Sequence, residues 1–78
     1  MATLRLFAAA REAAGRATTT IDAPTVGAVL DEARVLFGEH FAAVLGASRV
    51  WLNGEPATDD AAVAAGDTVA VLPPVSGG

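Results

Sequence analysis

The amino-acid sequence predicts an α+β domain, in which a four- to five-stranded mixed sheet carries one main helix across one face. Stretches of alternating polar and apolar residues occur near both ends and after the middle of the chain, as in half-buried strands. Between them, apolar residues recur every three or four positions, which is typical of one face of a helix. The 78 residues allow a single unit of this kind, because a chain of this size buries only about 60% of its unfolded surface.

Two strands are expected near the N-terminus, at residues 3–7 and 18–22. The first alternates as Thr-Leu-Arg-Leu-Phe, and the second is a run of β-branched residues. The alanine-rich residues 8–15 between them predict a loop with a helical turn that stops at Gly15. Two strands joined this closely would pair antiparallel.

The main helix is expected to begin at Thr25, a favourable N-cap, and to end at Gly38. A second short helical turn is expected over residues 41–45, closed by Gly46. The residues that form the apolar stripe of the main helix are Val26, Val29, Leu30, Ala33 and Phe37.

The second half of the chain predicts strands at residues 49–53 and 68–72, with a short extended segment at 55–58 and a turn or single helical turn over 59–65. Asn53-Gly54 and Gly66-Asp67 are turn signals. This order of elements matches a ubiquitin-like β-grasp, in which the first and last strands form a parallel pair in the middle of the sheet. Proline cannot donate to a ladder, so Pro73-Pro74 divide the chain into a domain (1–72) and an extended tail (73–78).

Composition excludes several classes of function. The chain has no cysteine and one histidine, which argues against disulfides, thiolate chemistry and a metal site. The net charge of −4 argues against binding to nucleic acid or to an anionic membrane. No apolar run approaches the length of about 20 residues that a bilayer requires. No signal peptide is visible, and a cytoplasmic location is expected.

The chemistry suggested by the sequence lies in the tail. Gly77 and Gly78 lack side chains, so they can pass through a channel too narrow for any Cβ. Six extended residues reach at most about 20 Å. The terminal carboxylate could therefore be delivered into a partner, activated there by adenylation with ATP, and converted by a sulfur donor into a thiocarboxylate. A frayed tail is the alternative, but the Gly-Gly end follows directly on a strand and a double proline.

The whole chain resembles the small subunit of molybdopterin synthase, a ubiquitin-like sulfur carrier. The helix matches in pattern only, and the final hexapeptide is the most specific element. The matching stretches are Leu6-Phe7-Ala8 with Arg11-Glu12 and Gly15, Leu52-Asn53-Gly54, Gly66-Asp67 with residues 69–72, and Pro73-Pro74-Val75-Ser76-Gly77-Gly78.

The resemblance implies a mechanism and two partners. An adenylyltransferase of the ubiquitin-activating type would use ATP to adenylate Gly78, which would then become a thiocarboxylate. The large subunit of molybdopterin synthase would accept the tail, and sulfur would pass to cyclic pyranopterin monophosphate. Two small subunits on a large-subunit dimer would form a heterotetramer. This chain would donate sulfur, bind no cofactor itself and leave the acid–base groups to the large subunit.

The resemblance also assigns residues. Gly78 is the reacting end. Phe7 and Leu72 are expected near the interface with the large subunit, although either could instead face the helix. Arg11 would pair with an acidic partner surface or remain a solvated charge. Independently of the resemblance, Trp51, as a single large aromatic residue on a half-buried strand, is expected to pack or, if exposed, to mark an interface. The expected partner-binding residues are Phe7, Arg11, Leu72, Pro73, Pro74, Val75, Ser76 and Gly77.

Three other functions are compatible with the same fold. The first is sulfur transfer in thiazole or cysteine biosynthesis, against which the Pro-Pro-Val-Ser segment favours molybdopterin. The second is a ubiquitin-like protein modifier, whose first chemical step would be identical. The third is a passive interaction domain, for which removal of Gly77 and Gly78 would change nothing.

Overall fold

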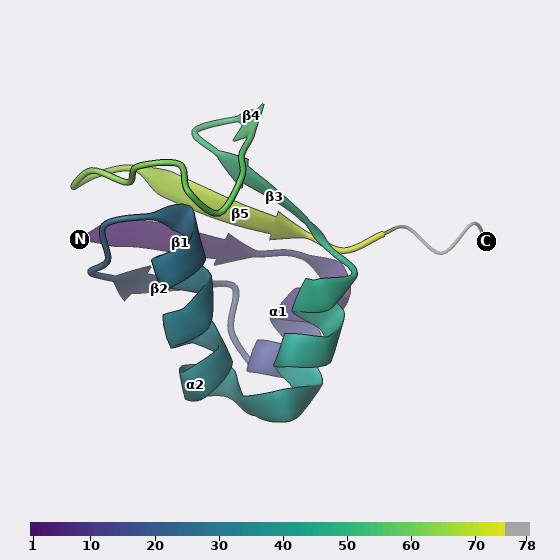
Figure 1. Cartoon of the computed structure of the whole chain (residues 1–78). Helices are drawn as coiled ribbons and strands as arrows, with labels where there is room; N and C mark the ends of the chain where they lie inside the picture. Colours follow the sequence, from purple (N-terminus) through teal and green to yellow (C-terminus); the bar gives the residue numbers. More distant parts are fainter. Residues whose placement is uncertain (75–78) are drawn as a thin grey trace.

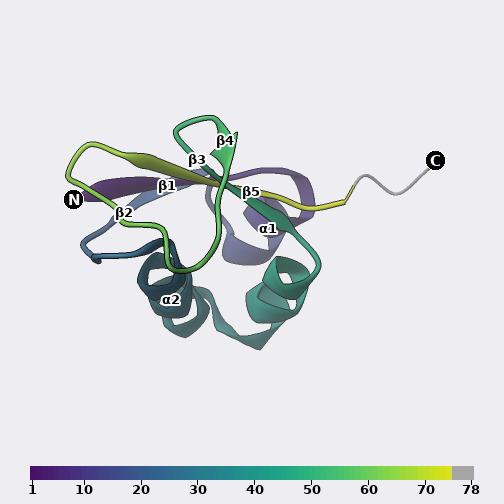
Figure 2. The same cartoon turned by 45° about the horizontal axis from the view of Figure 1, so that its top comes forward.

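A computed structural model of the chain describes residues 1–74 and contains a five-stranded sheet with two helices packed on one of its faces (Figures 1 and 2). The predicted α+β class is therefore confirmed. In chain order the elements are β1 (Ala2–Leu6), α1 (Ala8–Ala14), β2 (Thr18–Ile21), α2 (Val26–Gly46), β3 (Arg49–Leu52), β4 (Glu55–Pro56) and β5 (Thr68–Leu72).

The strands lie in the order β2-β1-β5-β3-β4. β1 and β5 form the central parallel pair, with Leu4 opposite Val69, and β2 pairs antiparallel with β1. β3 pairs antiparallel with the other edge of β5. This is the β-grasp arrangement that the sequence predicts.

The segment after β1 is more regular than expected. Residues 8–14 form a seven-residue helix, α1, where the sequence predicts a loop with one helical turn. Ala10 is fully buried and α1 packs against α2, so tertiary contacts stabilise this short helix. The predicted stop at Gly15 is confirmed, because Gly15 has a left-handed φ of 78° and its N–H donates to the Arg11 carbonyl. Phe7 belongs to the N-cap of α1 and not to the strand, which ends at Leu6.

The main helix begins as predicted, with Thr25 Oγ1 accepting a hydrogen bond of 3.1 Å from the Ala28 amide. α2 consists of two helical segments (Figure 1): the first ends at Gly38, as predicted, and the second, predicted over residues 41–45, follows it and is closed at Gly46. Gly38 takes φ 88° and ψ −171°, and helical structure resumes after this kink and continues to Gly46. The kink returns Phe41 to the core, where it is fully buried with its ring centroid 5.1 Å from that of Phe37.

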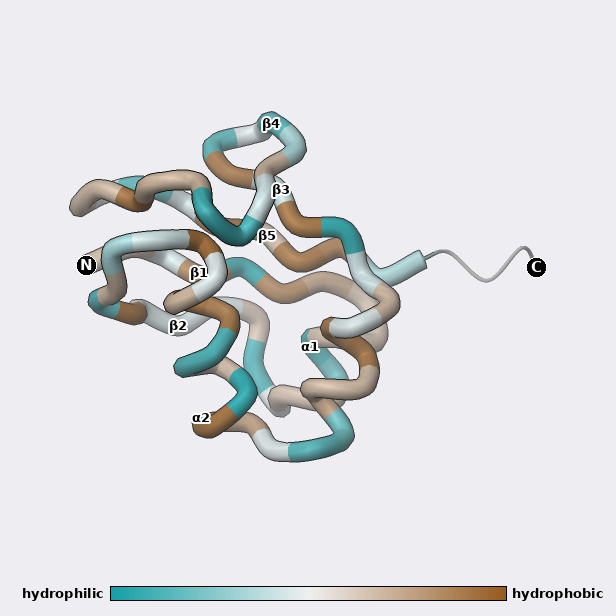
Figure 3. The backbone as a smooth tube through the Cα atoms, viewed as in Figure 1, coloured by the Kyte–Doolittle hydropathy of each residue, from teal (hydrophilic) through white to brown (hydrophobic). Residues whose placement is uncertain are grey.

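The core lies between the sheet and the two helices. Val69 and Val71 point into it from β5, as Leu4 and Leu6 do from β1. Because side chains alternate along a strand, Leu72 points to the other side of the sheet. Figure 3 shows apolar positions on both the strands and the helices.

Residues 57–67 connect β4 to β5 by turns, without the helical turn that was one of the two expectations for 59–65. Asp67 Oδ2 accepts a 2.8 Å hydrogen bond from the Ala64 amide. Asn53, with a positive φ of 50°, occupies the predicted turn with Gly54, and its Oδ1 accepts a 2.9 Å bond from the Thr68 amide. These bonds tie both connections to the start of β5.

Candidate functional site

The face of the sheet that points away from the helices is called the outer face here, and it carries side chains from β1, β3 and β5. Pairing places Arg5 and Trp51 on either side of Ala70, while Arg49 lies opposite Leu72. The neighbours of these residues in β1 and β5 are buried in the core, so the alternation of strand side chains directs the set outward.

The outer face exposes apolar side chains. Phe7 is 38% exposed and Leu72 is 37% exposed, while Trp51 is half-buried. Phe7 and Leu72 therefore do not pack under the helix, which was the alternative that the sequence left open. Contiguous apolar side chains on a protein surface mark interaction sites.

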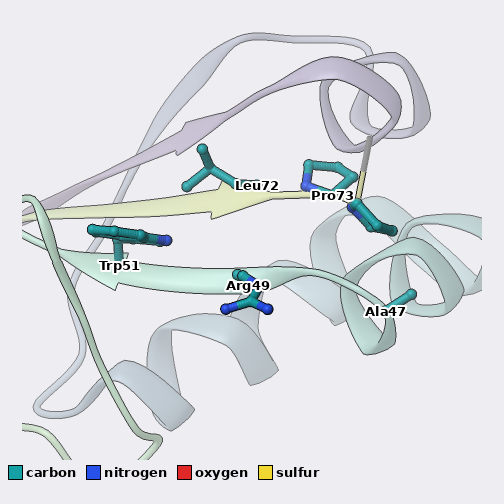
Figure 4. A pocket seen from close by; sticks show the side chains of 6 residues that line it. Ala47, Arg49, Trp51, Leu72 and Pro73 are labelled. Atoms are coloured by element: carbon teal, nitrogen blue, oxygen red, sulfur yellow. The ribbon is translucent and has the colours of Figure 1, made fainter. Parts of the chain in front are cut away.

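Two hollows lie side by side on the outer face, and both are bordered by Trp51 and Leu72. The hollow farther from the start of the tail is called the distal hollow and the nearer one the proximal hollow. The distal hollow, of about 270 Å³, is lined by Phe7, Trp51, Gly54, Thr68, Ala70 and Leu72. The proximal hollow, of about 300 Å³, is lined by Ala47, Arg49, Trp51, Leu72, Pro73 and Pro74. Figure 4 shows Arg49 and Trp51 on β3 next to Leu72 on β5 and to Pro73 just beyond it, all of which line the proximal hollow. The two hollows lie at or just below the lower end of the roughly 300–1,000 Å³ that pockets for small molecules usually measure.

The start of the tail belongs to the same surface. Pro73 and Pro74 line the proximal hollow directly after β5. A protein seated on the outer face would therefore contact the point at which the tail leaves the domain. Val75, Ser76, Gly77 and Gly78 lie outside the described residues, so their assigned roles remain predictions.

The basic groups of the outer face are Arg5 and Arg49, and both are exposed. The Arg5 guanidinium lies 5.5 Å from the centroid of the Phe7 ring, within range of a cation–π interaction. Within residues 1–74 the ion pair that forms is Arg34–Asp31 on α2, at 2.7 Å. Neither arginine of the outer face is neutralised by a carboxylate from this part of the chain.

The sequence of this chain matches the profile of the ThiS family over residues 4–78. The chain belongs to the ThiS family of ubiquitin-like sulfur carriers. The resemblance inferred from the sequence motifs is confirmed at this level.

Solved structures with the same fold support this membership. SAMP1 from Haloferax volcanii is 37% identical to this ThiS-family chain, with a TM-score of 0.88 over 99% of this chain and 98% of SAMP1. A putative molybdopterin converting factor subunit 1 from Pyrococcus furiosus is 25% identical, with a TM-score of 0.83 over 95% and 97% of the two chains.

A third structure contains a partner. In the complex of subunits 1 and 2 of the molybdopterin-converting factor from Helicobacter pylori, the matching chain is 22% identical, with a TM-score of 0.75 over 99% of this chain and 97% of that chain. This likeness shows the shared fold. No curated protein sequence matches the chain significantly.

The structure gathers four of the predicted partner-binding residues of this ThiS-family chain and leaves one apart. Phe7, Leu72, Pro73 and Pro74 line the two hollows. Arg11 is exposed on α1 and lines neither of them, so its pairing with a partner remains a prediction.

Sequence reasoning missed Arg5, Arg49 and Ala70 and left Trp51 undecided. The signal that would have found them is the period of two in the last strand. With Val69 and Val71 assigned to the core, Ala70 must face outward, and residues paired with it across the sheet must follow.

The described part of the chain offers few other kinds of site. Residues 1–74 contain no group of three or more histidine, cysteine or acidic side chains arranged to hold a metal ion. No helix in the same range is long and apolar enough to cross a bilayer.

Proposed function

We propose that this ThiS-family chain is the sulfur-carrier subunit of molybdopterin synthase. Its terminal Gly78 carboxylate is adenylated, converted to a thiocarboxylate, and used to donate sulfur to cyclic pyranopterin monophosphate. The observation that carries the proposal is the continuity of the apolar outer face with Pro73 and Pro74, because the tail that ends in Gly77-Gly78 starts there.

The chemistry at Gly78 consists of three transfers. The carboxylate oxygen attacks the α-phosphorus of ATP, which forms an acyl adenylate and releases pyrophosphate. Sulfide then attacks the acyl carbon, displaces AMP and leaves sulfur there; with a protein persulfide as the donor, the first product is an acyl disulfide, which a thiol cleaves to the thiocarboxylate and a protein disulfide. In the last step the thiocarboxylate sulfur attacks a carbon of the pterin precursor and displaces an oxygen substituent from it, and water then hydrolyses the acyl–sulfur bond, which restores the carboxylate and leaves the sulfur on the pterin.

The chain delivers the reacting group but does not supply the catalytic groups. The tail contains no ionisable side chain, since it reads Pro-Pro-Val-Ser-Gly-Gly. Acid–base and phosphate-binding groups would come from the adenylyltransferase and from the large subunit. The Helicobacter pylori relative is solved with its subunit 2, and the proposal assigns this chain an equivalent large-subunit partner.

The Pro-Pro-Val-Ser sequence before the glycines favours the molybdopterin pathway over thiazole or cysteine biosynthesis. Those pathways would use the same thiocarboxylate and differ in the protein that receives the tail. The identity of the binding partner therefore distinguishes them.

A second candidate function is protein modification. SAMP1 from Haloferax volcanii, which is 37% identical to this chain, is described as a small archaeal modifier protein. In that case an amine of a target protein would attack the Gly78 adenylate, displace AMP and form an amide bond. All five basic residues of this chain are arginine, so chains linked through its own lysine side chains cannot form.

Intact-mass spectrometry tests the proposal. The protein is incubated with ATP, the adenylyltransferase from the same organism and a sulfide source, and a variant lacking Gly78 serves as the control. We expect the mass gain for replacing one oxygen by sulfur, located by fragmentation at Gly78, and sulfur transfer when the large subunit and the pterin precursor are added. Loading without transfer would assign another sulfur pathway. Amide-linked conjugates and no thiocarboxylate would favour the modifier.

A further inference from the structure

The centre of the outer face is a row of three paired residues, Arg5, Ala70 and Trp51, from three adjacent strands. Ala70 has only a methyl side chain, so the surface of the outer face is recessed at this position. Larger side chains stand around it, namely Phe7, Leu72 and Trp51. The distal hollow therefore results from a small residue set among large ones.

Trp51 holds a special place in this arrangement, because it borders both hollows. It is the only tryptophan of the chain, and it is half-buried rather than packed in the core. Tryptophan at the centre of an apolar patch is among the residues that contribute most to protein association.

The charged side chains at the outward-facing positions of β1, β3 and β5 are both basic. Arg5 and Arg49 flank the apolar centre, and neither pairs with a carboxylate from residues 1–74. The chain as a whole carries a net charge of −4, so its basic groups on this face are not an effect of overall composition. A docked protein that presents carboxylates to these guanidinium groups would gain charge-assisted hydrogen bonds, and one that presents cations would be repelled.

We infer that this chain selects the protein that receives its tail through two features of the outer face. Trp51 and the distal hollow over Ala70 are the anchor point, which binds an apolar side chain of that protein. Arg5 and Arg49 are the charge filter, which favours a partner surface with carboxylates. The occupant is a folded protein whose docking surface places an apolar side chain between Trp51 and Phe7 and carboxylates opposite the two arginines. The inference rests on the proposed function and names the chemistry of its partner surface.

Two observations favour this occupant over others. The proximal hollow continues from Trp51 to Pro73 and Pro74, so a protein docked at Trp51 also lies where the tail begins. A second copy in a two-fold dimer would bring the same patch, with its two arginines, against itself. Like charges would then face each other across an apolar contact, which disfavours self-association.

A single fluorine label tests the position of the contact. Because the chain has one tryptophan, incorporation of 5-fluorotryptophan places one ¹⁹F signal at Trp51. The probes are the unlabelled adenylyltransferase and the unlabelled large subunit from the same organism, added separately at low salt. We expect the signal to shift or broaden on addition of each probe and to stay unchanged when the labelled chain is concentrated alone.

Variants test the energetics by calorimetric titration with the same two probes. Ala70→Phe fills the distal hollow without removing any contact, and Trp51→Ala removes its wall. Each should weaken binding by about tenfold or more. The matched controls are Ala43→Phe and Leu36→Ala, which change exposed positions on α2 and should bind as the original chain does.

The charge filter has its own readout. Binding of the original chain should weaken as salt rises, and the double variant Arg5→Glu, Arg49→Glu should bind weakly at low salt and more tightly as salt rises. The double replacement of both residues by lysine should restore the original salt dependence, and Arg16→Glu, in the exposed loop before β2, should leave it unchanged.

The results separate the inference from the proposed function. If the original chain is loaded with sulfur and binds, yet Ala70→Phe, Trp51→Ala and the double reversal bind equally well, the inference is wrong and the proposed function stands. A ¹⁹F shift on concentrating the chain alone would assign the patch to a second copy and overturn it as well. If the original chain is neither loaded nor bound, both fail together.

Discussion

The two faces of the sheet are formed by the same strands, but their apolar side chains have different roles. On the inner face, Leu4 and Val71 are fully buried under the helices. On the outer face, Leu72 and Phe7 are more than one third exposed, although they are equally apolar. Apolar residues on the inner face stabilise the fold, whereas those on the outer face are available to a partner. Matched substitutions on the two faces can therefore separate stability from function.

The largest expected effect is on the inner face. Leu4→Ala removes a fully buried side chain from β1 and should lower the free energy of unfolding by about 2–5 kcal/mol. Urea unfolding followed by circular dichroism measures the loss. A loss below about 1 kcal/mol would contradict the assignment of Leu4 to the core.

The second effect concerns the kink that lets α2 cover the inner face. Gly38→Ala introduces a side chain at φ 88° and ψ −171°, a conformation restricted almost to glycine, and should cost about 1–3 kcal/mol. No atom lies within 4 Å of the new Cβ, so the cost is backbone strain and not a clash. Gly46→Ala is the matched control, because Gly46 has open space and no positive φ. It should be neutral or stabilising in the same unfolding assay.

A smaller effect on stability is expected on the outer face. Leu72→Ala replaces the same residue type as Leu4→Ala, but its side chain is 37% exposed, so unfolding should change by less than about 1 kcal/mol. Binding to the large subunit, measured by calorimetry, should nevertheless weaken about tenfold. Equal stability losses for Leu4→Ala and Leu72→Ala would remove the distinction between the two faces.

The smallest effect lies at the turn that leads into β5. The hydrogen bond from the Ala64 amide, and then that from Asn53, lower the pKa of Asp67 below its usual 3.8. Because the pKa of Asp67 is lower in the folded state than in the unfolded state, its carboxylate stabilises the fold at pH values above the unfolded-state pKa. This contribution is lost as the pH falls through the folded-state pKa. Asp67→Asn keeps an acceptor oxygen and removes the titration. The melting temperature of the original chain should therefore fall more steeply below pH 3.8 than that of the variant. Parallel curves would contradict this role.

Local signals in the sequence predicted several elements correctly. Thr25 caps α2, Gly15 ends α1, Asn53 and Gly54 form a turn with positive φ at both positions, and β5 has the predicted bounds. In each case the residue type satisfies a backbone requirement that depends on its immediate neighbours.

The elements that differed depend on distant contacts. The alanine-rich segment has no strong apolar stripe, and it becomes the helix α1 because Ala10 is buried in the core. The helical segment after Gly38 is longer than the single turn predicted over residues 41–45, because Phe41 and Leu45 pack it against the core. Trp51 could be assigned to neither face until β3 was paired with β5.

By itself, the sequence determined the order of the elements, their turns and caps, and the tail whose carboxylate is the reactive group in the proposal. Only the tertiary structure decided which alternate residues of each strand face outward. The alternation of side chains along a strand does not say which of the two alternate sets faces the core. The helices that cover one side of the sheet decide this. That choice buries Val69 and Val71 and leaves Ala70 and Leu72 on the outer face beside Trp51 and the start of the tail.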